Sequence, residues 1–529
     1  MTTSEAVQQD EGSSVRLVEV LGTLSLAIDL NVGQSMEHAL RSAILAVRLG
    51  EAVGLDEIEL TDCYYLALLR HVGCTAEART AAAVFRDEIT ARTWFAPVVN
   101  GQRSEMFAAI LRNMGKDKQP LERARRLVGT CMGLPKLMHA VDAECEVARQ
   151  LAERWGFGAE VQSALTQALE RWDGQGMPHQ LRGEAISRPM RVTQLALDAE
   201  LFFQLGGVEA AVAMARQRAG RAHDPAIVER FCADAPHLLA DLDRSSVWEL
   251  ALATEPGPQP RLAPSQFDTT ARAIADFVSL QSPYLTGHSS GVADLAAGAA
   301  RGLRLPEADV VTLRRAGWLH DLGRVTVSAG IWAKPGPLSE GEWERVRLYP
   351  YHTGRILARS EALAPIGVLA ALHHERLDGS GYHRGLGSTA LSLSARILAV
   401  ADVYQALTEP RPHRPARTAD EAAGELRTEV RAGRLDGEAA NAVLAAAGHR
   451  VRTTRHTWPA GLSEREVVVL RLVAQGLGNR EMAACLDLSE RTVHHHIQHI
   501  YQKLGISTRA AATLFAMQHN LLADDVLAP

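Results

Sequence analysis

Histidines and aspartates occur between residues 288 and 402 in combinations that metal sites use. The candidate ligands are a single histidine, a His-Asp pair, a His-His pair and a single aspartate: His288, His320, Asp321, His373, His374 and Asp402. Imidazoles and carboxylates suit first-row divalent cations such as iron or manganese, and a carboxylate can bridge two cations. Two bridged cations can activate a water molecule for attack on phosphorus, so this inventory predicts a dinuclear site that hydrolyses a phosphodiester.

Helices are expected to position these groups. The segment LHDLGR ends a helical pattern, HHERLDGSGYH leaves a helix for a glycine-rich loop, and ARILAVADVYQAL returns to a helix. Elsewhere, Ala-, Leu- and Arg-rich segments place apolar residues at helical spacing, and strand-like alternation is rare. The sequence therefore predicts an all-α protein.

Residues 275–447 resemble the HD-GYP family of cyclic dinucleotide phosphodiesterases. The motifs that carry the resemblance are HDLGR, WAKPGPLSEGEW, HHERLDGSGY and ARILAVAD followed by RPHRPA. The resemblance implies that the six residues above bind the metals and that Asp321 and Arg324 act in catalysis. It also implies substrate contacts from Arg411, Arg414 and Tyr382, and an arginine fork matches a phosphate bidentately.

Three departures from that family pattern bear on the activity. Tyr349 stands where the family has a histidine ligand in an HPxxG segment, and His352 would share its helix face and is a seventh candidate ligand. If His352 does not reach the site, one metal position is weakened or lost. Arg324 replaces a lysine and can clamp phosphate but cannot release a proton near neutral pH. His383 replaces the proline of the GYP loop, which leaves the choice of substrate open.

The first half of the chain resembles the second. His38 and Gly73 lie 250 residues before His288 and Gly323, whereas ERWDGQGMP lies 205 residues before ERLDGSGYH. The first copy has lost the paired ligands and therefore predicts a sensing, dimerising or scaffolding role. The expected organisation is a disordered tail, a degenerate HD-like domain, a linker, an HD-GYP-like domain, a second linker and a DNA-binding domain, at residues 1–15, 16–250, 251–266, 267–447, 448–460 and 461–525.

Residues 461–522 predict a four-helix DNA-binding domain. Ser463 and Glu466 form a capping box, glycines interrupt the pattern at 476–478, and Ser489 begins a further helix. The segment resembles the LuxR-type helix-turn-helix domain through RTVxxHxxxIxxKLG. That resemblance implies that the helix after Ser489 enters the major groove of DNA. The implied DNA contacts are Arg491, Thr492, His494, His495, Gln498 and Lys503.

Composition limits the partners and the compartment. The net charge of −6 excludes a protein that coats nucleic acid, so any DNA contact is local. Six scattered cysteines without a CxxC pair are typical of buried thiols in a reducing compartment. No stretch approaches the roughly 18 apolar residues of a spanning helix, so we expect no membrane contact and a cytoplasmic location.

Three functional hypotheses remain open at this point. In the first, a homodimeric regulator binds and hydrolyses a cyclic dinucleotide such as cyclic di-GMP, and this changes its binding to DNA. In the second, a catalytically inactive transcription factor uses its HD-like copies only to sense a ligand or to dimerise. In the third, the substrate is some other nucleotide.

Overall fold

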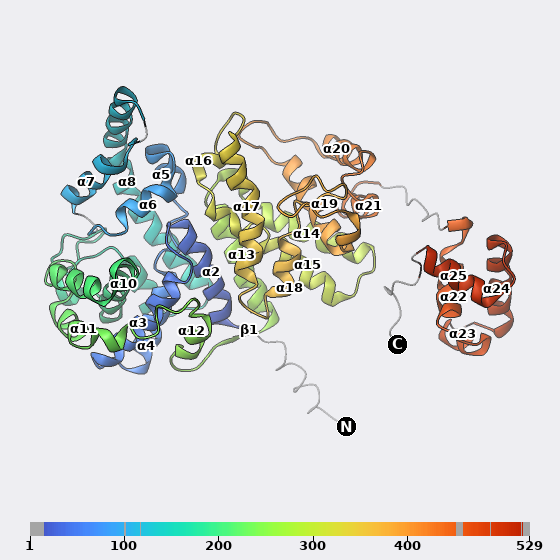
Figure 1. Cartoon of the computed structure of the whole chain (residues 1–529), viewed down its shortest axis with the longest axis horizontal. Helices are drawn as coiled ribbons and strands as arrows, with labels where there is room; N and C mark the ends of the chain where they lie inside the picture. Colours follow the sequence, from blue (N-terminus) through green and yellow to red (C-terminus); the bar gives the residue numbers. More distant parts are fainter. Residues whose placement is uncertain are drawn as a thin grey trace. The chain divides into compact units, whose positions relative to one another are not determined.

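The computed structural model describes residues 15–99, 102–116, 118–450, 459–486, 488–519 and 521 (Figure 1). Within these ranges the protein is helical apart from one two-stranded antiparallel sheet, in agreement with the predicted all-α class. None of the described helices is long and apolar enough to cross a membrane. The expected tail, for residues 1–14, and most of the second expected linker, residues 451–458, lie outside the described residues.

The chain divides into two compact units, residues 1–449 and 450–529, so both HD-like copies belong to one unit. The first copy contains β1 (Val15–Arg16), α2 (Leu17–Asn31), α3 (His38–Ala52), α4 (Glu57–Leu69), α5 (Ala78–Phe85), α6 (Glu88–Phe95), α7 (Arg103–Asn113), α8 (Pro120–Arg154), α9 (Ala159–Thr166), η2 (Gly183–Ala185), α10 (Arg188–Arg218), α11 (Pro225–Leu238) and α12 (Trp248–Thr254).

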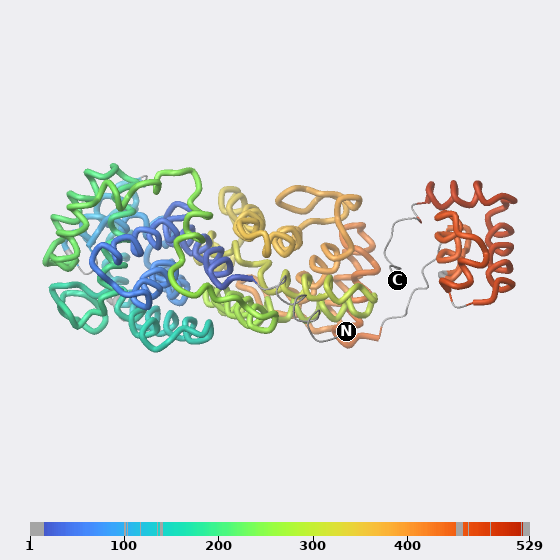
Figure 2. The backbone as a smooth tube through the Cα atoms, turned by 90° about the horizontal axis from the view of Figure 1, so that it is seen from below, coloured from blue at the N-terminus to red at the C-terminus, as the bar shows by residue number. Residues whose placement is uncertain are grey.

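The second copy follows a short connection (Figure 2). It contains β2 (Arg261–Leu262), α13 (Pro264–Ser279), η3 (Pro283–Leu285), α14 (His288–Gly302), α15 (Glu307–Leu319), η4 (Leu322–Thr326), α16 (Ala329–Trp332), α17 (Glu340–Leu357), α18 (Ala364–Ala370), η5 (Ser388–Ala390), α19 (Leu393–Thr408), α20 (Ala419–Arg431) and α21 (Gly437–Ala446). The segment expected as the first linker, residues 251–266, holds the end of α12, strand β2 and the start of α13.

Two glycines show that the copies pack alike. A Cβ atom on Gly73 would lie 2.0 Å from the carbonyl oxygen of Glu144, and one on Gly323 would lie 2.1 Å from that of Tyr349. Only glycine allows such close backbone approach. Glu144 and Tyr349 are 205 residues apart, whereas the glycines are 250 apart, so the additional residues of the first copy lie between 73 and 144.

The glycine-rich loop is built by the same hydrogen bonds in both copies. The buried carboxylate of Glu170 accepts hydrogen bonds from the backbone N–H groups of His179 and Leu181 at 2.6 and 2.9 Å. Glu375 accepts from Arg384 and Leu386, both at 2.8 Å. Each pair of partners lies 205 residues apart, which agrees with an internal duplication.

The C-terminal unit is a small helical domain. It contains η6 (Pro459–Gly461), α22 (Glu464–Ala474), α23 (Asn479–Leu486), α24 (Glu490–Leu504) and α25 (Arg509–Gln518) around one apolar core. Ser463 accepts from the backbone N–H of Glu466, and Ser489 accepts from that of Thr492 at 3.1 Å, so both capped helices begin where their serines predict.

Candidate metal centre and substrate cavity

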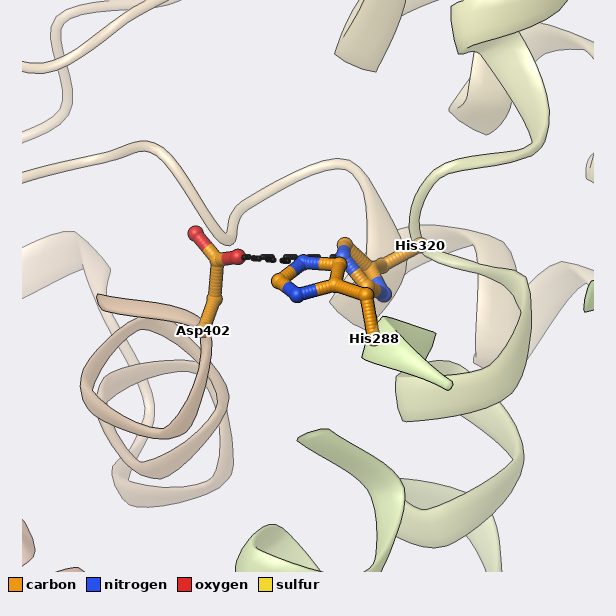
Figure 3. A group of neighbouring side chains, drawn as sticks. All are labelled: His288, His320 and Asp402. Atoms are coloured by element: carbon orange, nitrogen blue, oxygen red, sulfur yellow. Dashed lines mark ion pairs between the residues drawn. The ribbon is translucent and has the colours of Figure 1, made fainter. Parts of the chain in front are cut away.

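Four helices bring the candidate ligands together. His288 begins α14, His320 and Asp321 follow α15, the His-His pair follows α18, and Asp402 lies inside α19. Three groups of side chains could each hold a cation, because their ligand atoms lie within 4.8 Å of one another: His288, His320 and Asp402; His320, Asp321 and His373; His373, His374 and Asp402. In Figure 3 the imidazoles of His288 and His320 both point toward the Asp402 carboxylate.

Hydrogen bonds at Nδ1 orient three of the imidazoles. His288 Nδ1 lies 2.8 Å from Glu409 Oε2, whereas Nδ1 of His320 and of His373 lie 2.7 and 2.6 Å from backbone carbonyl oxygens. A proton held on Nδ1 leaves the Nε2 lone pair directed into the cluster, which is the usual arrangement of metal-binding histidines. The sequence did not predict a role for Glu409, because this residue contacts His288, which lies 121 positions away in the chain.

The charges of the cluster favour a cation. Burial and the adjacent His320 lower the pKa of His373 to about 4, so its imidazole is neutral at pH 7. Burial alone would lower the pKa of His288, but Asp402 and Glu409 raise it to about 9. The buried carboxylates therefore require a positive partner, which is either a proton on His288 or a bound metal.

Two buried atoms in the cluster support metal binding independently of those charges. His320 Nε2 and Asp321 Oδ1 are buried and have no hydrogen-bond partner among the described residues. Such atoms are costly unless something else satisfies them. A cation that contacts both atoms would satisfy them, so the six ligands fit a metal site.

Tyr349 lies inside the cluster. Its hydroxyl is 2.7 Å from His373 Nε2 and 2.6 Å from His374 Nε2, and its side chain is fully buried. A metal bound by both histidines would lie about 2.0–2.1 Å from each nitrogen and would compete with this hydroxyl for the same space. The sequence identified Tyr349 as a departure from the family pattern but not where its hydroxyl would lie.

The structure does not bring His352 to the metal cluster. It lies in α17, as its candidacy required, but it belongs to none of the three ligand groups. Three residues turn a helix by about 300°, which leaves about 60° between the directions of the two side chains. The ring of His352 instead lies 5.5 Å from that of Tyr351, centroid to centroid.

A cavity of about 690 Å³ opens beside the cluster. Its lining includes His288, Arg324, Trp332, Tyr349, His374, Tyr382, Asp402, Arg411 and Arg414. The Arg324 guanidinium lies over the Trp332 ring, 3.7 Å from its centroid, and its Nε atom is buried without a hydrogen-bond partner. A phosphate oxygen in the cavity would satisfy that donor.

The two arginines expected at the substrate have different partners. Arg411 donates to the carbonyl oxygen of Tyr284 and to Glu409 Oε2, at 3.0 and 3.1 Å. Among the described residues, the Arg414 guanidinium donates only to carbonyl oxygens, including those of Ala406 and Leu407. The Arg414 guanidinium therefore stabilises the backbone of the turn that carries Arg411. The Tyr382 ring contacts that of His374, with centroids 4.6 Å apart.

The residues expected to contact DNA are only partly free on the surface of the C-terminal unit. Arg491, His494, His495 and Gln498 are exposed on α24. Lys503 pairs with Glu466 at 2.6 Å and donates to the carbonyl oxygen of Gly461 at 2.9 Å. Thr492 shares a hydrogen bond with the helix cap, Ser489. Lys503 and Thr492 thus have hydrogen-bond partners within the domain when no DNA is bound.

Comparisons with known proteins identify both parts of the chain. The HD domain family matches residues 272–439, and the family described as bacterial regulatory proteins, luxR family, matches residues 460–516. The 3'3'-cGAMP-specific phosphodiesterase 3 of Vibrio cholerae is 30% identical over 411 residues, which are 77% of this chain and 89% of that protein. A stretch of that length also includes much of the first copy.

Other relatives match less of the chain. A cyclic di-GMP phosphodiesterase of Pseudomonas aeruginosa is 41% identical over 140 residues, 26% of this chain and 34% of that protein. Among solved structures, a cyclic GMP-AMP specific phosphodiesterase of V. cholerae superimposes with a TM-score of 0.57 at 27% identity. That match covers 83% of this chain and 99% of that one.

Proposed function

Because the chain belongs to the family of HD-domain cyclic dinucleotide phosphodiesterases and ends in a LuxR-type DNA-binding domain, we propose that it is a transcription regulator that hydrolyses a cyclic dinucleotide. The observation that carries the proposal is the cluster of six candidate ligands, in which the buried His320 Nε2 and Asp321 Oδ1 have no hydrogen-bond partner among the described residues. We also propose a cytoplasmic location, where DNA is available.

The proposed cofactors are two divalent cations such as iron or manganese. His288, His320 and Asp402 would hold one cation, and His373, His374 and Asp402 would hold another beside Tyr349. When bound, the cations supply Lewis-acid stabilisation of the phosphoryl oxygens and lower the pKa of a water molecule.

The protein's own side chains would bind and orient the phosphodiester. Arg324 and Arg411 line the cavity and present planar donors to phosphate oxygens. Arg324 stays protonated throughout, so it stabilises charge and does not supply the leaving group's proton. Arg414 would act indirectly, through the turn that carries Arg411, and the Tyr382 ring would form a wall for the nucleotide.

The relatives suggest two substrates to test. They are named for 3'3'-cGAMP and for cyclic di-GMP, and the cavity of about 690 Å³ is within the range of small-molecule sites. The purified chain, loaded with iron or manganese or treated with a chelator, is incubated with each dinucleotide, and the products are separated by chromatography. Metal-dependent appearance of a linear dinucleotide supports the proposal, and no product from either substrate with a loaded protein rejects it.

Tyr349 favours a second candidate function, a transcription factor that binds the dinucleotide without hydrolysing it. Its hydroxyl lies between the Nε2 atoms of His373 and His374, where it competes with a cation. In that case calorimetry would show saturable binding of the dinucleotide by a protein that gives no product.

The proposed DNA contacts are the exposed side chains of α24. Arg491, His494, His495 and Gln498 would approach the DNA, and Thr492 and Lys503 would contact phosphates only after giving up their internal partners. Selection of bound sequences from a random DNA pool, repeated with Gln498→Ala, tests this. The variant should lose sequence preference at one position, and an unchanged preference would exclude Gln498 as a base contact.

We propose that two copies of the chain associate. Exposed apolar side chains from α7 and α8 line a groove: Phe107, Leu111, Val128 and Met132 are 48%, 41%, 60% and 76% exposed. Exposed apolar groups gathered in one patch mark interaction surfaces, and a two-fold DNA site would require two copies of the LuxR-type domain. Analytical ultracentrifugation should show a dimer that Val128→Glu dissociates, with Arg112→Glu, on the same hairpin, as control.

If the dinucleotide regulates DNA binding, the effect is reciprocal. DNA must then change the affinity for the dinucleotide by the same factor as the dinucleotide changes the affinity for DNA. Titrations with a catalytically inactive variant measure both affinities. A factor that differs between the two titrations would exclude this coupling.

A further inference from the structure

The first copy contains a cavity of about 280 Å³ where the second copy has its metal cluster. The two sites correspond residue by residue, through the offsets of 250 and 205 that relate the copies. The lining includes His38, Arg70, His71, Ala168 and Leu197, which correspond to His288, His320, Asp321, His373 and Asp402.

Because of these replacements, the first site favours a negatively charged ligand, whereas the metal cluster of the second copy favours a cation. An arginine, Arg70, replaces a histidine ligand, and His71 and Leu197 replace both carboxylates. Burial lowers the pKa of His71 well below its usual value, so the group is neutral at pH 7. The site has thus lost the anions that would hold a metal and gained a fixed cation in a ligand's place.

Arg70 forms no hydrogen bond or ion pair through its side chain with any residue that the structure describes. This guanidinium lines the cavity and is largely removed from bulk solvent. Removing a charge from water is costly unless an opposite charge compensates for it. An anion in the cavity would provide that compensation.

A second guanidinium lines the same cavity. Arg92 donates to the backbone and side-chain oxygens of Asn31, at 3.0 and 2.7 Å, and to the carbonyl oxygen of Cys74 at 2.6 Å. It forms no ion pair with a carboxylate among the described residues. Two arginines without carboxylate partners suit a doubly charged group better than a singly charged one.

The acidic residues around the cavity do not cancel these charges. Asp198 is bound by Arg218 and by His223, whose Nε2 lies 3.0 Å from its carboxylate. Glu170 accepts the loop hydrogen bonds described above. Glu144 also lines the cavity; burial raises the pKa of its carboxyl, whereas the nearby Arg92 and Arg70 act to lower it, and one carboxylate does not balance two guanidinium groups.

We propose that this cavity is a regulatory site for a phosphate monoester or free phosphate, held by Arg70 and Arg92. Its volume is less than half that of the cavity in the second copy, and it is too small for a whole cyclic dinucleotide. A mononucleotide with its phosphate inserted, or inorganic phosphate, matches both the charge and the size.

Helix α6 connects this cavity to the metal centre. Arg92 lies one turn after Glu88 on α6. The buried Glu88 carboxylate accepts from Ser328 Oγ at 2.5 Å and from the backbone N–H of Ala329 at 2.7 Å. A ligand that moves Arg92 therefore acts on the segment that follows η4.

Asn31 provides a second connection. Its side chain accepts from Arg92 through Oδ1 and donates through Nδ2 to the carbonyl oxygen of Val325, 2.8 Å away. Val325 is adjacent to Arg324 in η4. An anion that attracts the Arg92 donors would weaken the hold of Asn31 on η4 and so change the position of Arg324. This part of the inference rests on the proposed function, because it predicts control of hydrolysis.

Binding is tested apart from catalysis, in an Asp321→Ala chain kept free of metal with a chelator. Inorganic phosphate, AMP and GMP are titrated separately by calorimetry, which distinguishes free phosphate from a nucleotide as the source. We expect a saturable site whose affinity is about 10- to 100-fold weaker in Arg70→Gln. Arg70→Lys should bind with intermediate affinity, and Arg79→Gln, which changes an exposed arginine of α5, should bind normally.

Absence of binding by all three probes, or binding that Arg70→Gln leaves unchanged, would overturn the proposal. If Arg70→Gln fails to fold, Arg70→Lys still decides the outcome. This result is independent of whether the chain is a phosphodiesterase, because Asp321→Ala removes a metal ligand.

Coupling is tested with Asn31→Ala and Glu88→Gln. Both variants should bind the probe, but the probe should no longer change hydrogen exchange in residues 322–332 or, in the metal-loaded chain, the rate of hydrolysis. Unaltered exchange on binding to the wild-type chain would show that the site is not regulatory.

Discussion

The two copies share a scaffold but differ at the residues that face the site. In both, a buried glutamate, Glu170 or Glu375, holds the glycine-rich loop by hydrogen bonds of matching register. In both, a glycine packs against the backbone of a later helix, α8 or α17. The candidate metal ligands other than the first histidine, in contrast, persist in only one copy. Residues that maintain the fold are therefore the same in both copies, whereas residues that perform chemistry differ. Variants at matching places in the two copies test this distinction.

The largest difference is expected at the His-Asp pair. Asp321→Ala removes a ligand of the metal site, and loss of several kcal/mol of stabilisation from a cation corresponds to about a thousandfold lower rate. His71→Ala, at the matching position of the first copy, should retain metal content and rate. Elemental analysis and product chromatography measure both. Equal loss in the two variants would mean that the first copy also takes part in the reaction.

The next largest effect concerns the carboxylates that orient the first histidines. Glu409→Ala removes the partner of His288 Nδ1 and should weaken metal binding about 10- to 100-fold. The matched variant, Glu200→Ala, removes the partner of His38 Nδ1 in the first copy and should leave metal binding unchanged. Competition with a chromogenic chelator gives the two affinities. Wild-type affinity in Glu409→Ala would show that this carboxylate does not orient a ligand.

A smaller effect, on stability, is expected at Asp198, one residue from the position that corresponds to Asp402. Burial alone would raise the pKa of Asp198, but His223 and Arg218 lower it to about 2. Because the folded-state pKa is lower than the usual 3.8, the carboxylate stabilises the fold above pH 4 and loses this effect as the pH falls toward 2.

Asp198→Asn should therefore lower the free energy of unfolding by about 2 kcal/mol at pH 7. The difference from wild type should shrink between pH 4 and pH 2, as followed by urea unfolding. A difference independent of pH would assign the effect to packing. The metal content should not change, in contrast to variants of Asp402.

The smallest effect is expected at Tyr349 and its counterpart Glu144. Tyr349→His replaces the hydroxyl beside His373 and His374 with an imidazole and should strengthen binding of a second cation about tenfold. Metal titration followed by calorimetry measures this. Glu144→His, in the first copy, should create no metal site, because the other ligands are missing there. Unchanged stoichiometry in Tyr349→His would mean that Tyr349 does not limit the second position.

The sequence was sufficient to predict the helical class, the paired ligands and the capped helices of the DNA-binding domain, because these features depend on residues close together in the chain. It did not identify Glu409, whose partner His288 is 121 residues away, or the contact of Asn31 with Val325 across 294 residues. These contacts depend on how distant helices pack. The candidacy of His352 assumed that residues three apart on a helix reach the same site, but its direction differs from that of Tyr349.

The short sheet of β1 and β2 has a consequence for how this chain could arise. Val15 pairs with Leu262 and Arg16 with Arg261, so the start of the first copy meets the junction with the second. Arg16 also pairs with Glu255, and the backbone N–H of Leu17 donates to the carbonyl oxygen of Pro260 at 2.8 Å. Because the entry and exit of the first copy are adjacent, a whole copy can be gained or lost in evolution without displacing the chain that continues into its neighbour.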